Sequence, residues 1–412
     1  MVFACQENSF LKEFKTTVSS CKKSQIKTLV NQKQTILSGY DVVFDDTILF
    51  PEGGGQPCDL GKLQFLTDGN ECEIPVIRVS RRGSEAIHFI ETEIKEGQSV
   101  KQVLNWERRF DHMQQHSGQH LITAVADKSF GCATLSWWLG EDISYIELDT
   151  PEFNNINELE KIVNDYILAA TPVIVNVYEA DNDELKKVRT RGLPDDHRGP
   201  VRVISIEGVD NNMCCGTHVS NLNQLQCIKV IKVEKGNKGH SLLYFLSGSR
   251  VLNQMGKMMQ REQALTSILK NSPLVHAELV DKLQKSTKTT SKYLQALLKD
   301  LAVLEAAKIK QIVPKPTHYA LHRKEGDSDF MNTLIREIND QDILLFLTVG
   351  EEKSCGNMVL YGKPEFVEAL GPKICALLEG KGAGKGSKFQ AKVRNLSTKE
   401  KASELIESYF KK

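Results

Sequence analysis

The sequence predicts an α+β multidomain protein. Its 412 residues are too many for one hydrophobic core, since cores stop growing at about 250–300 residues. Short runs typical of strands fill residues 1–105, a helical period fills 248–312, and helices alternate with strands elsewhere. We therefore expect a β-barrel-like domain at 1–105, an α+β domain at 106–247, a helical arm at 248–312 and a C-terminal α/β domain at 313–412.

Residues 1–105 contain a glycine-rich segment between expected strands. Asp41–Phe44 and Ile74–Val79 are typical of strands, and Pro51–Pro57 between them reads Pro-Glu-Gly-Gly-Gly-Gln-Pro. Three consecutive glycines allow positive φ and let another part of the chain approach the backbone closely. The pattern alone also fits an ordinary tight turn.

The second region begins with a helix that carries two histidines. Asp111 precedes a glutamine by three residues, as in a capping box, so we expect a helix from Asp111 to about Asp127. His116 and His120 are four residues apart and therefore share one helix face. Gly118 costs roughly 1 kcal/mol relative to Ala inside a helix, which indicates a close neighbour there.

Strands and a helix then lead to a second group of metal-type residues. We expect strands at 143–148, 173–177, 201–206, 228–233 and 241–246 and a helix around 159–167. The strand at 201–206 precedes Cys214-Cys-Gly-Thr-His218, in which a thiol and an imidazole are four residues apart in a turn.

Residues 248–312 predict two helices with a break at Asn271–Pro273. The second helix carries leucines on one face: Leu294, Leu297, Leu298, Leu301 and Leu304. Such a face packs against the same chain or against a second copy. The sequence leaves open whether a homodimer forms, through this arm or through the C-terminal domain.

The last hundred residues return to α/β, with strands expected at 342–347 and 357–361 and a helix at 366–378. The stretch that starts at Gly380 is not a P-loop, because its glycine spacing is too short and Gly386 replaces the magnesium-binding Ser or Thr. We expect a flexible loop up to Lys392. Its lysines either contact a nucleic-acid backbone or are only solvated: Lys381, Lys385 and Lys388.

The two pairs together suit zinc, which accepts imidazole nitrogen and thiolate sulfur in tetrahedral geometry. The candidate ligands are His116, His120, Cys214 and His218. Ser117 stands where a metallopeptidase helix has its glutamate base, and the long separation of the pairs excludes a zinc finger. Four ligands fill the shell, as in structural sites, whereas hydrolysis needs water or substrate at the metal. Whether zinc is catalytic or structural stays open.

Composition limits the partners. The formal net charge is zero, so an RNA partner has to meet local basic clusters. No segment suits a bilayer span or a signal peptide, so we expect no membrane partner. Ten scattered cysteines predict reduced thiols and hence a cytoplasmic location.

Several motifs together resemble the alanyl-tRNA editing family. His116-Ser-Gly-Gln-His120 with Cys214-x-x-x-His218 resembles the signature of the editing domain, found inside alanyl-tRNA synthetases and in free-standing AlaX proteins. Phe50–Pro57 resembles the glycine-rich motif of longer AlaX proteins, and Thr134–Gly140 the segment whose threonine recognises serine. The C-terminal region is similar to that of alanyl-tRNA synthetase. The chain is thus identified as a member of the longest AlaX class, with one departure: Cys215 replaces a glycine and could compete with Cys214 for metal.

The resemblance implies a trans-editing deacylase that hydrolyses the ester of tRNA(Ala) mischarged with serine or glycine at a Zn²⁺ site. It implies catalytic roles for His116, His120 and Thr134. The implied substrate contacts are Gly53, Gly54, Gly55, Gln56 and Thr134. The alternative is a non-catalytic tRNA-binding protein with a structural zinc.

Overall fold

The structure is a computed structural model that describes residues 2–30, 33–67, 69–179, 182–188, 200–352 and 355–411. The chain separates into two compact units, Met1–Gln263 and Ala264–Lys412, and each is described by itself. Both units combine sheets and helices, which confirms a mixed α+β, multidomain fold. The finer division into four domains stays a prediction.

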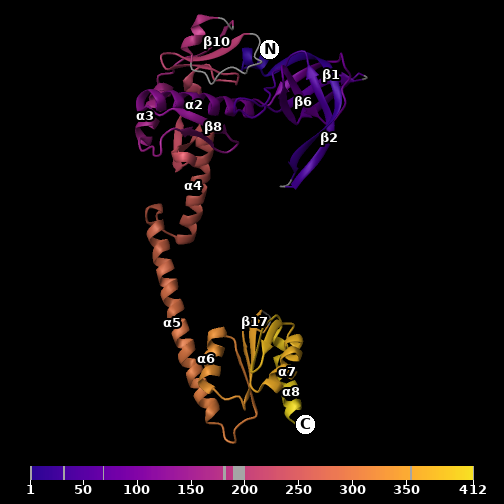
Figure 1. Cartoon of the computed structure of the whole chain (residues 1–412), viewed down its shortest axis with the longest axis vertical. Helices are drawn as coiled ribbons and strands as arrows, with labels where there is room; N and C mark the ends of the chain where they lie inside the picture. The colour runs from indigo at the N-terminus through magenta and orange to yellow at the C-terminus, as the bar shows by residue number, and fades with distance from the viewer. Residues whose placement is uncertain are drawn as a thin grey trace. The chain divides into compact units, whose positions relative to one another are not determined.

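The N-terminal part of the first unit is an antiparallel sheet in the order β4-β3-β7-β1-β2-β6-β5 (Figure 1). Its elements are α1 Ala4–Glu7, β1 Glu13–Val30, β2 Lys33–Phe44, β3 Gly61–Thr67, β4 Asn70–Val76, β5 Arg78–Arg82, β6 Glu85–Ile90 and β7 Ser99–Leu104. A register shift between Val18 and Ser20 lets the first part of β1 pair with β7 and the remainder with β2. The barrel-like arrangement is not confirmed, since in the described residues this order is open, with β4 and β5 at its ends.

The helix α2, Trp106–Phe130, follows this sheet and is the central element of the unit (Figure 1). It begins because the side chain of Asn105 accepts a hydrogen bond from the Arg108 N–H. It ends at Gly131, whose φ of 64° suits the left-handed C-cap. Every residue from 112 to 126 is buried, so the helix is enclosed on all sides.

The expectation that α2 begins at Asp111 is wrong. Asp111 lies inside the helix, where its carboxylate accepts from Nε and Nη2 of Arg250 at 2.7 and 2.6 Å. This ion pair joins α2 to the start of α4 (Ser249–Leu269). Asp111 therefore has the spacing of a capping box, but its side chain makes a tertiary contact rather than capping the helix.

One sheet, in the order β13-β14-β9-β8, packs with α3 against α2 around a common hydrophobic core. Its elements are β8 Thr134–Leu139, β9 Ser144–Leu148, α3 Ile156–Leu168, β13 Ile228–Lys235 and β14 Ser241–Ser247. A Cβ placed on Gly118 would lie 3.2 Å from the side chain of Ser247 on β14. The close neighbour predicted at Gly118 is thereby confirmed.

A smaller antiparallel sheet precedes Cys214 in the chain. Its strands are β10 Val173–Tyr178, β11 Val201–Ile206 and β12 Asp210–Met213, in that order. Short 3-10 helices flank the strands of this unit: η1 Asp183–Lys187, η2 Leu222–Leu225 and η3 Asn237–Gly239. Because β12 ends at Met213, the cysteine turn starts directly at the edge of this sheet.

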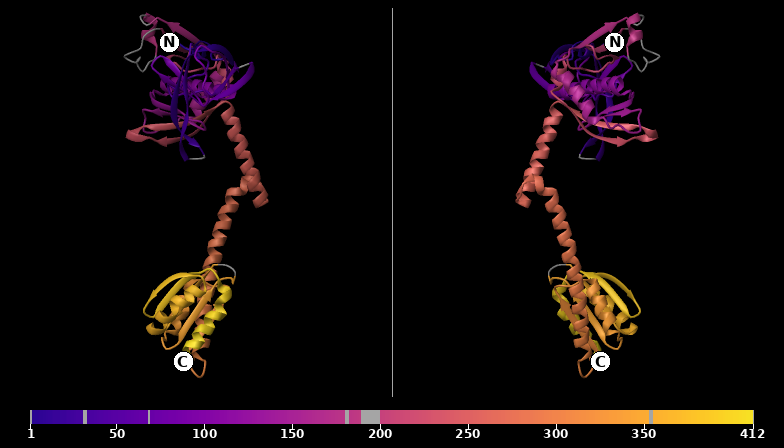
Figure 2. Two further views of the ribbon diagram at one scale, coloured as in Figure 1. Left: turned by 90° about the vertical axis from the view of Figure 1, so that its right-hand side faces the viewer. Right: turned by 90° about the vertical axis from the view of Figure 1, so that its left-hand side faces the viewer.

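The second unit is a sheet with helices on both faces, in the order β15-β16-β17-β19-β18. Its elements are η4 Pro273–Val275, α5 His276–Lys310, β15 His318–Arg323, α6 Ser328–Ile338, β16 Leu344–Val349, β17 Gly356–Tyr361, α7 Pro364–Leu377, β18 Lys381–Lys385, β19 Lys388–Val393, η5 Leu396–Thr398 and α8 Lys399–Phe410. One face packs on α5 and α6 and the other on α7 and α8 (Figures 1 and 2). Every residue of β16 is buried, as expected for a strand covered on both sides.

The flexible loop expected from Gly380 to Lys392 is wrong, because this stretch forms the hairpin β18–β19. Side chains at Gly382 and Gly384 would overlap β19, so these glycines permit close strand pairing rather than disorder.

All ten cysteines are free in this structure, and the reduced state of the thiols stays a prediction. Of the helices in the described ranges, none combines the length and apolar character that a bilayer crossing requires. The cytoplasmic location stays a prediction.

Candidate metal centre

Side chains from α2 and from the turn after β12 converge on one point. The ligand atoms of the four predicted residues, His116, His120, Cys214 and His218, all lie within 4.8 Å of one another. Cys214 Sγ lies 3.4 Å from His116 Nε2 and 3.2 Å from His218 Nε2. With metal–ligand distances of about 2.0–2.3 Å, neighbouring ligands of a tetrahedral zinc are separated by roughly 3.3–3.6 Å. This group can therefore hold a metal ion, and its donor set suits zinc.

Arg202 on β11 fixes the backbone of the turn that carries the thiol. Its Nη1 donates to the carbonyl oxygens of Cys214 at 2.8 Å and Gly216 at 2.7 Å, and its own carbonyl accepts from the Cys214 N–H. A Cβ on Gly216 would overlap the imidazole of His116, so only glycine fits there. The turn is thus held against α2 by a buried guanidinium and by a close backbone approach.

Two polar side chains orient the imidazoles. Gln56 Oε1 accepts from His116 Nδ1 at 2.9 Å and from the Thr217 N–H at 3.0 Å. An amide oxygen only accepts, so Nδ1 of His116 carries the proton and Nε2 presents its lone pair toward Cys214 Sγ. Ser117 Oγ lies 3.1 Å from His218 Nδ1 and holds that ring with its Nε2 toward the same sulfur. Such contacts fix the orientation of metal-binding histidines.

Burial keeps these imidazoles neutral. It lowers the pKa of His116 and of His218 well below the ordinary value, and the neighbouring histidines lower both further. Burial, together with the neighbouring Cys215, raises the pKa of the Cys214 thiol, and Arg202 opposes this shift. A metal has to displace the thiol proton, so metal affinity should rise with pH.

The glycine-rich segment forms a tight turn, and its backbone lies close to the side chain of Trp137 on β8. Gly53 and Gln56 exchange backbone hydrogen bonds of 3.2 and 3.0 Å, and Gly54 and Gly55 have φ of 61° and 81°. Trp137 Nε1 donates to the Gly54 carbonyl at 3.1 Å, and a Cβ on Gly55 would lie 2.5 Å from that Nε1. The segment therefore joins the N-terminal sheet to β8 while Gln56 reaches the metal centre.

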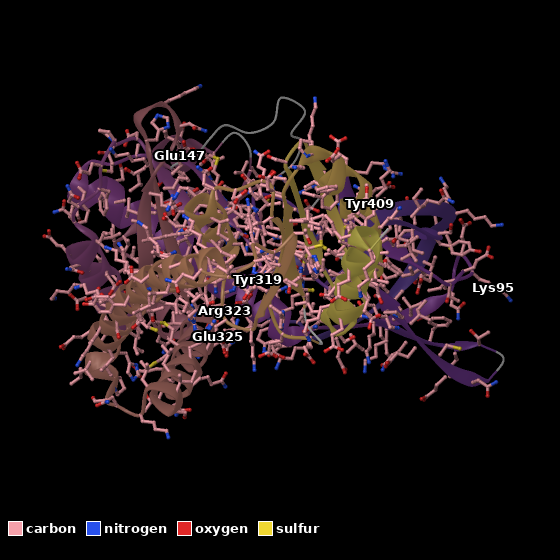
Figure 3. All side chains as sticks on the ribbon, turned by 90° about the horizontal axis from the view of Figure 1, so that it is seen from below. Lys95, Glu147, Tyr319, Arg323, Glu325 and Tyr409 are labelled. Atoms are coloured by element: carbon pink, nitrogen blue, oxygen red, sulfur yellow. The ribbon has the colours of Figure 1, made fainter. Side chains whose placement is uncertain are left out.

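Thr134, the predicted serine-recognising residue, is the first residue of β8. Its hydroxyl donates to Thr123 Oγ1 at 3.0 Å, and Thr123 lies on α2 one turn after His120. On β8, Ser136 donates to Glu147 of β9 (labelled in Figure 3), which also pairs with His240 at 2.9 Å. These contacts hold the strand that carries Thr134.

The predicted tRNA-contact lysines lie on one face of the hairpin β18–β19 in the second unit. Lys381 is opposite Lys392, and Lys385 is opposite Lys388. Phe389 and Ala391 point from the other face into the core, since side chains alternate along a strand. Like charges directly opposite each other destabilise a sheet, so these two lysine pairs cost the hairpin some stability.

Sequence reasoning missed Lys392 as a member of this face, and it missed Gln56, Ser117 and Arg202 as supports of the metal centre. The lysine could have been found by alternation once a hairpin was assumed. The other contacts join segments far apart in sequence, and no local pattern signals them.

The comparisons with known proteins first define a class. Residues 201–244, which contain β11, Cys214 and His218, match the family model described as the threonyl and alanyl tRNA synthetase second additional domain. The chain thus shares a domain with aminoacyl-tRNA synthetases.

Full-length relatives narrow this class. The alanyl-tRNA editing protein Aarsd1 of Mus musculus is 50% identical over 412 residues, covering 99% of this chain and 98% of the relative. The putative alanyl-tRNA editing protein alaX of Saccharomyces cerevisiae is 28% identical, covering 96% and 94%. The alanyl-tRNA editing protein AlaX-M of Methanosarcina barkeri is 33% identical and covers 57% of this chain and 94% of the relative. The chain belongs to the alanyl-tRNA editing protein family.

Proposed function

We propose that the chain is a trans-editing deacylase that hydrolyses the ester of tRNA(Ala) mischarged with serine, and also with glycine. One observation carries the proposal: a pair of imidazoles on α2 and a thiol–imidazole pair from the turn after β12 meet at one point in a chain whose relatives are named alanyl-tRNA editing proteins. The substrate ester joins a small amino acid to a ribose hydroxyl, so hydrolysis needs a polarised carbonyl and a positioned water.

The residues present fit a zinc ion held by His116, His120, Cys214 and His218. When bound, Zn²⁺ supplies Lewis acidity toward a carbonyl oxygen or a water. Gln56 and Ser117 keep the Nε2 lone pairs of two of these imidazoles directed inward. Neutral imidazoles are the form that binds metal, and burial of His116 and His218 favours that form by lowering their pKa.

Thr134 is the proposed partner of the serine hydroxyl. Its own hydroxyl donates to Thr123, which leaves its oxygen lone pairs available as acceptors. A site that hydrogen-bonds a substrate hydroxyl discriminates strongly against an analogue that lacks it. Gly53, Gly54 and Gly55 are the proposed backbone contacts to substrate, because their turn lies between β8 and the metal centre.

Single-turnover deacylation tests the proposal. The zinc-loaded chain should hydrolyse Ser-tRNA(Ala), and His116→Ala and His120→Ala should abolish the reaction. Thr134→Val should slow Ser-tRNA(Ala) about ten-fold or more while changing Gly-tRNA(Ala) little, and Thr134→Ser should retain the wild-type rate, because one hydrogen bond to substrate is worth roughly 1–3 kcal/mol. Absence of turnover by a zinc-loaded chain that binds tRNA(Ala) would contradict the proposal.

The alternative function is a non-catalytic tRNA-binding protein with a structural zinc. The four-residue donor set favours it, since a full protein shell is typical of structural sites. Under this alternative the histidine variants would lose stability together with metal, and the wild type would show no turnover.

We propose that Lys381, Lys385 and Lys388 contact the tRNA.

We also propose that the chain forms a homodimer through α5. Leu294, Leu297 and Leu304 are exposed and follow coiled-coil spacings of three and seven, whereas Leu301 between them packs partly against the core of the second unit. Leu297 and Leu304 are 66% and 60% exposed. Sedimentation should show a dimer that Leu297→Glu dissociates and Gln295→Glu, on another helix face, does not.

A further inference from the structure

A cleft of about 730 Å³ opens in the first unit beside the metal centre. Its walls come from β1, β5, the glycine-rich segment, the start of α2 and β8. We call it the basic cleft, after its charged and aromatic lining residues: Lys27, Glu52, Arg78, Arg81, Arg108 and Trp138. Its volume lies within the range of about 300–1,000 Å³ that is usual for ligand sites.

The cleft carries an excess of positive charge. Arg78 pairs with Glu52 at 3.1 Å, and Arg108 pairs with the exposed Glu141 at 3.5 Å. The ion pairs of the described residues include neither Lys27 nor Arg81, and both of these residues are exposed. Arg81 Nε donates to the Gly83 carbonyl and its guanidinium lies over the Phe3 ring, contacts that leave its charge uncompensated. An anionic ligand would therefore meet two cations that have no ion-pair partner among the described residues.

Trp138 adds an aromatic platform to this charge. Its side chain is 51% exposed, although the ring rests on Gly140, where a Cβ would overlap it. A base can stack on a ring that is supported from one side in this way. Cations beside an exposed aromatic ring are the combination that binds single-stranded nucleic acid.

The glycine-rich segment is a wall that the cleft shares with the metal centre. Gly53, Gly55 and Gln56 line the cleft, and the same Gln56 accepts a hydrogen bond from His116 Nδ1. A polymer whose terminal ester lies at the metal centre could therefore place its preceding nucleotides along this wall. The ester of an aminoacyl-tRNA is on the last nucleotide of a single-stranded 3′ end, which has one phosphate per nucleotide.

We propose that the basic cleft binds the single-stranded 3′ end of the tRNA. Lys27 and Arg81 contact its phosphates, and Trp138 stacks on one of its bases. The assignment of this ligand rests on the proposed function, because that function brings the acylated end to the metal centre.

The test is binding of a fluorescently labelled single-stranded RNA that ends in CCA to the full chain, measured by anisotropy over a series of salt concentrations. Lys27→Gln and Arg81→Gln should each weaken binding and reduce the slope of log K against log salt by about 0.7, the value for one phosphate contact in a single strand. Trp138→Leu should weaken binding roughly five-fold, and Trp138→Phe, which keeps a ring, should weaken it less.

Arg82→Gln is the matched control, since it removes the same charge from the adjacent position of β5, outside the cleft lining. A blunt RNA duplex that contains the same strand should bind more weakly than the free strand. The proposal is overturned if the wild type does not bind the strand at low salt, if the duplex binds equally well, or if Arg81→Gln and Arg82→Gln have equal effects.

Failure of the proposed function would look different, because the RNA probe carries no ester. If RNA binding depends on Arg81 and Trp138 but Ser-tRNA(Ala) is not hydrolysed, the proposed role of the basic cleft is supported and the proposed deacylase function is contradicted. If the wild type hydrolyses Ser-tRNA(Ala) but the variants bind RNA as well as the wild type does, the proposed role of the basic cleft is wrong and the proposed deacylase function still holds.

Discussion

Gln56 is the residue that links the N-terminal sheet to the metal centre. It is 1% exposed and bonds both His116 and Thr217. Gln56→Leu should lower Zn²⁺ affinity about 10- to 100-fold, because the imidazole loses the acceptor that fixes its tautomer. Gln56→Glu keeps an acceptor oxygen and should retain more affinity. Competition with a chromophoric chelator measures this, and equal loss in both variants would contradict the tautomer argument.

His88, buried in the N-terminal sheet, makes the stability of the protein depend on pH. Its Nδ1 donates to the Val42 carbonyl, and burial lowers its pKa to about 4. The unfolded chain binds this proton below about pH 6.5, while the folded chain binds it only near pH 4, so stability is lost as pH falls between these values. From pH 7 to pH 5 this loss should be about 2 kcal/mol.

Urea denaturation at both pH values checks this prediction. His88→Gln removes the titrating group, so its loss of stability between pH 7 and pH 5 should be smaller than that of the wild type by about 2 kcal/mol. Identical pH dependence in the two proteins would mean that His88 is already protonated at pH 5 in the folded state.

Sequence reasoning found the metal-type residues because each pair is local. His116 and His120 are related by one helical turn, and Cys214 and His218 lie in one short turn. The helix start was wrong because Asp111 has the capping-box spacing to Gln114 but pairs with the distant Arg250, whereas the actual N-cap, Asn105, is followed by Arg108 and lacks that spacing. A local pattern does not show whether a side chain caps a helix or pairs with a residue far away in the sequence.

At the scale of elements, the hairpin β18–β19 shows how composition misleads. Glycine is rare in strands because it adds backbone entropy to the unfolded chain, so its alternation with lysine indicated a loop. In the structure, Gly382 and Gly384 are the positions where only hydrogen fits against β19. The alternation itself is the strand signal, because Gly382 and Gly384 share a face with the core residues of β19 while the lysines lie on the opposite face.

The hairpin lysines should act as one electrostatic surface. Replacing Lys381, Lys385, Lys388 and Lys392 together by Gln should stabilise the hairpin slightly, since opposed like charges are removed. It should also weaken tRNA binding and lower the salt slope by about one unit for each phosphate that the variant no longer binds. Thermal melting and filter binding measure the two effects. Lys62 and Lys101 in the N-terminal sheet, each paired with a glutamate, provide a control for loss of positive charge elsewhere on the surface.

At the scale of the whole molecule, the metal centre and the basic cleft belong to the first unit, and the lysine hairpin belongs to the second. The alternation of strands and helices predicted mixed α+β units. The extent of each sheet was not predictable, because strand order depends on contacts between segments far apart in sequence.

Because the metal centre and the lysine hairpin belong to different units, removing the second unit should lower the affinity for tRNA without slowing hydrolysis of bound substrate. A chain that ends at Leu269 keeps all of α4 and the metal centre but lacks the hairpin. It should need a higher tRNA concentration for half-maximal deacylation, because two contacts on one chain bind more tightly than either alone. At saturating enzyme its single-turnover rate should match the full chain, since Gln56, Thr134 and the four candidate ligands are all retained. A truncated chain with unchanged half-maximal concentration would show that the hairpin contributes no tRNA contact, and one with a lower saturating rate would show that the second unit takes part in the chemistry.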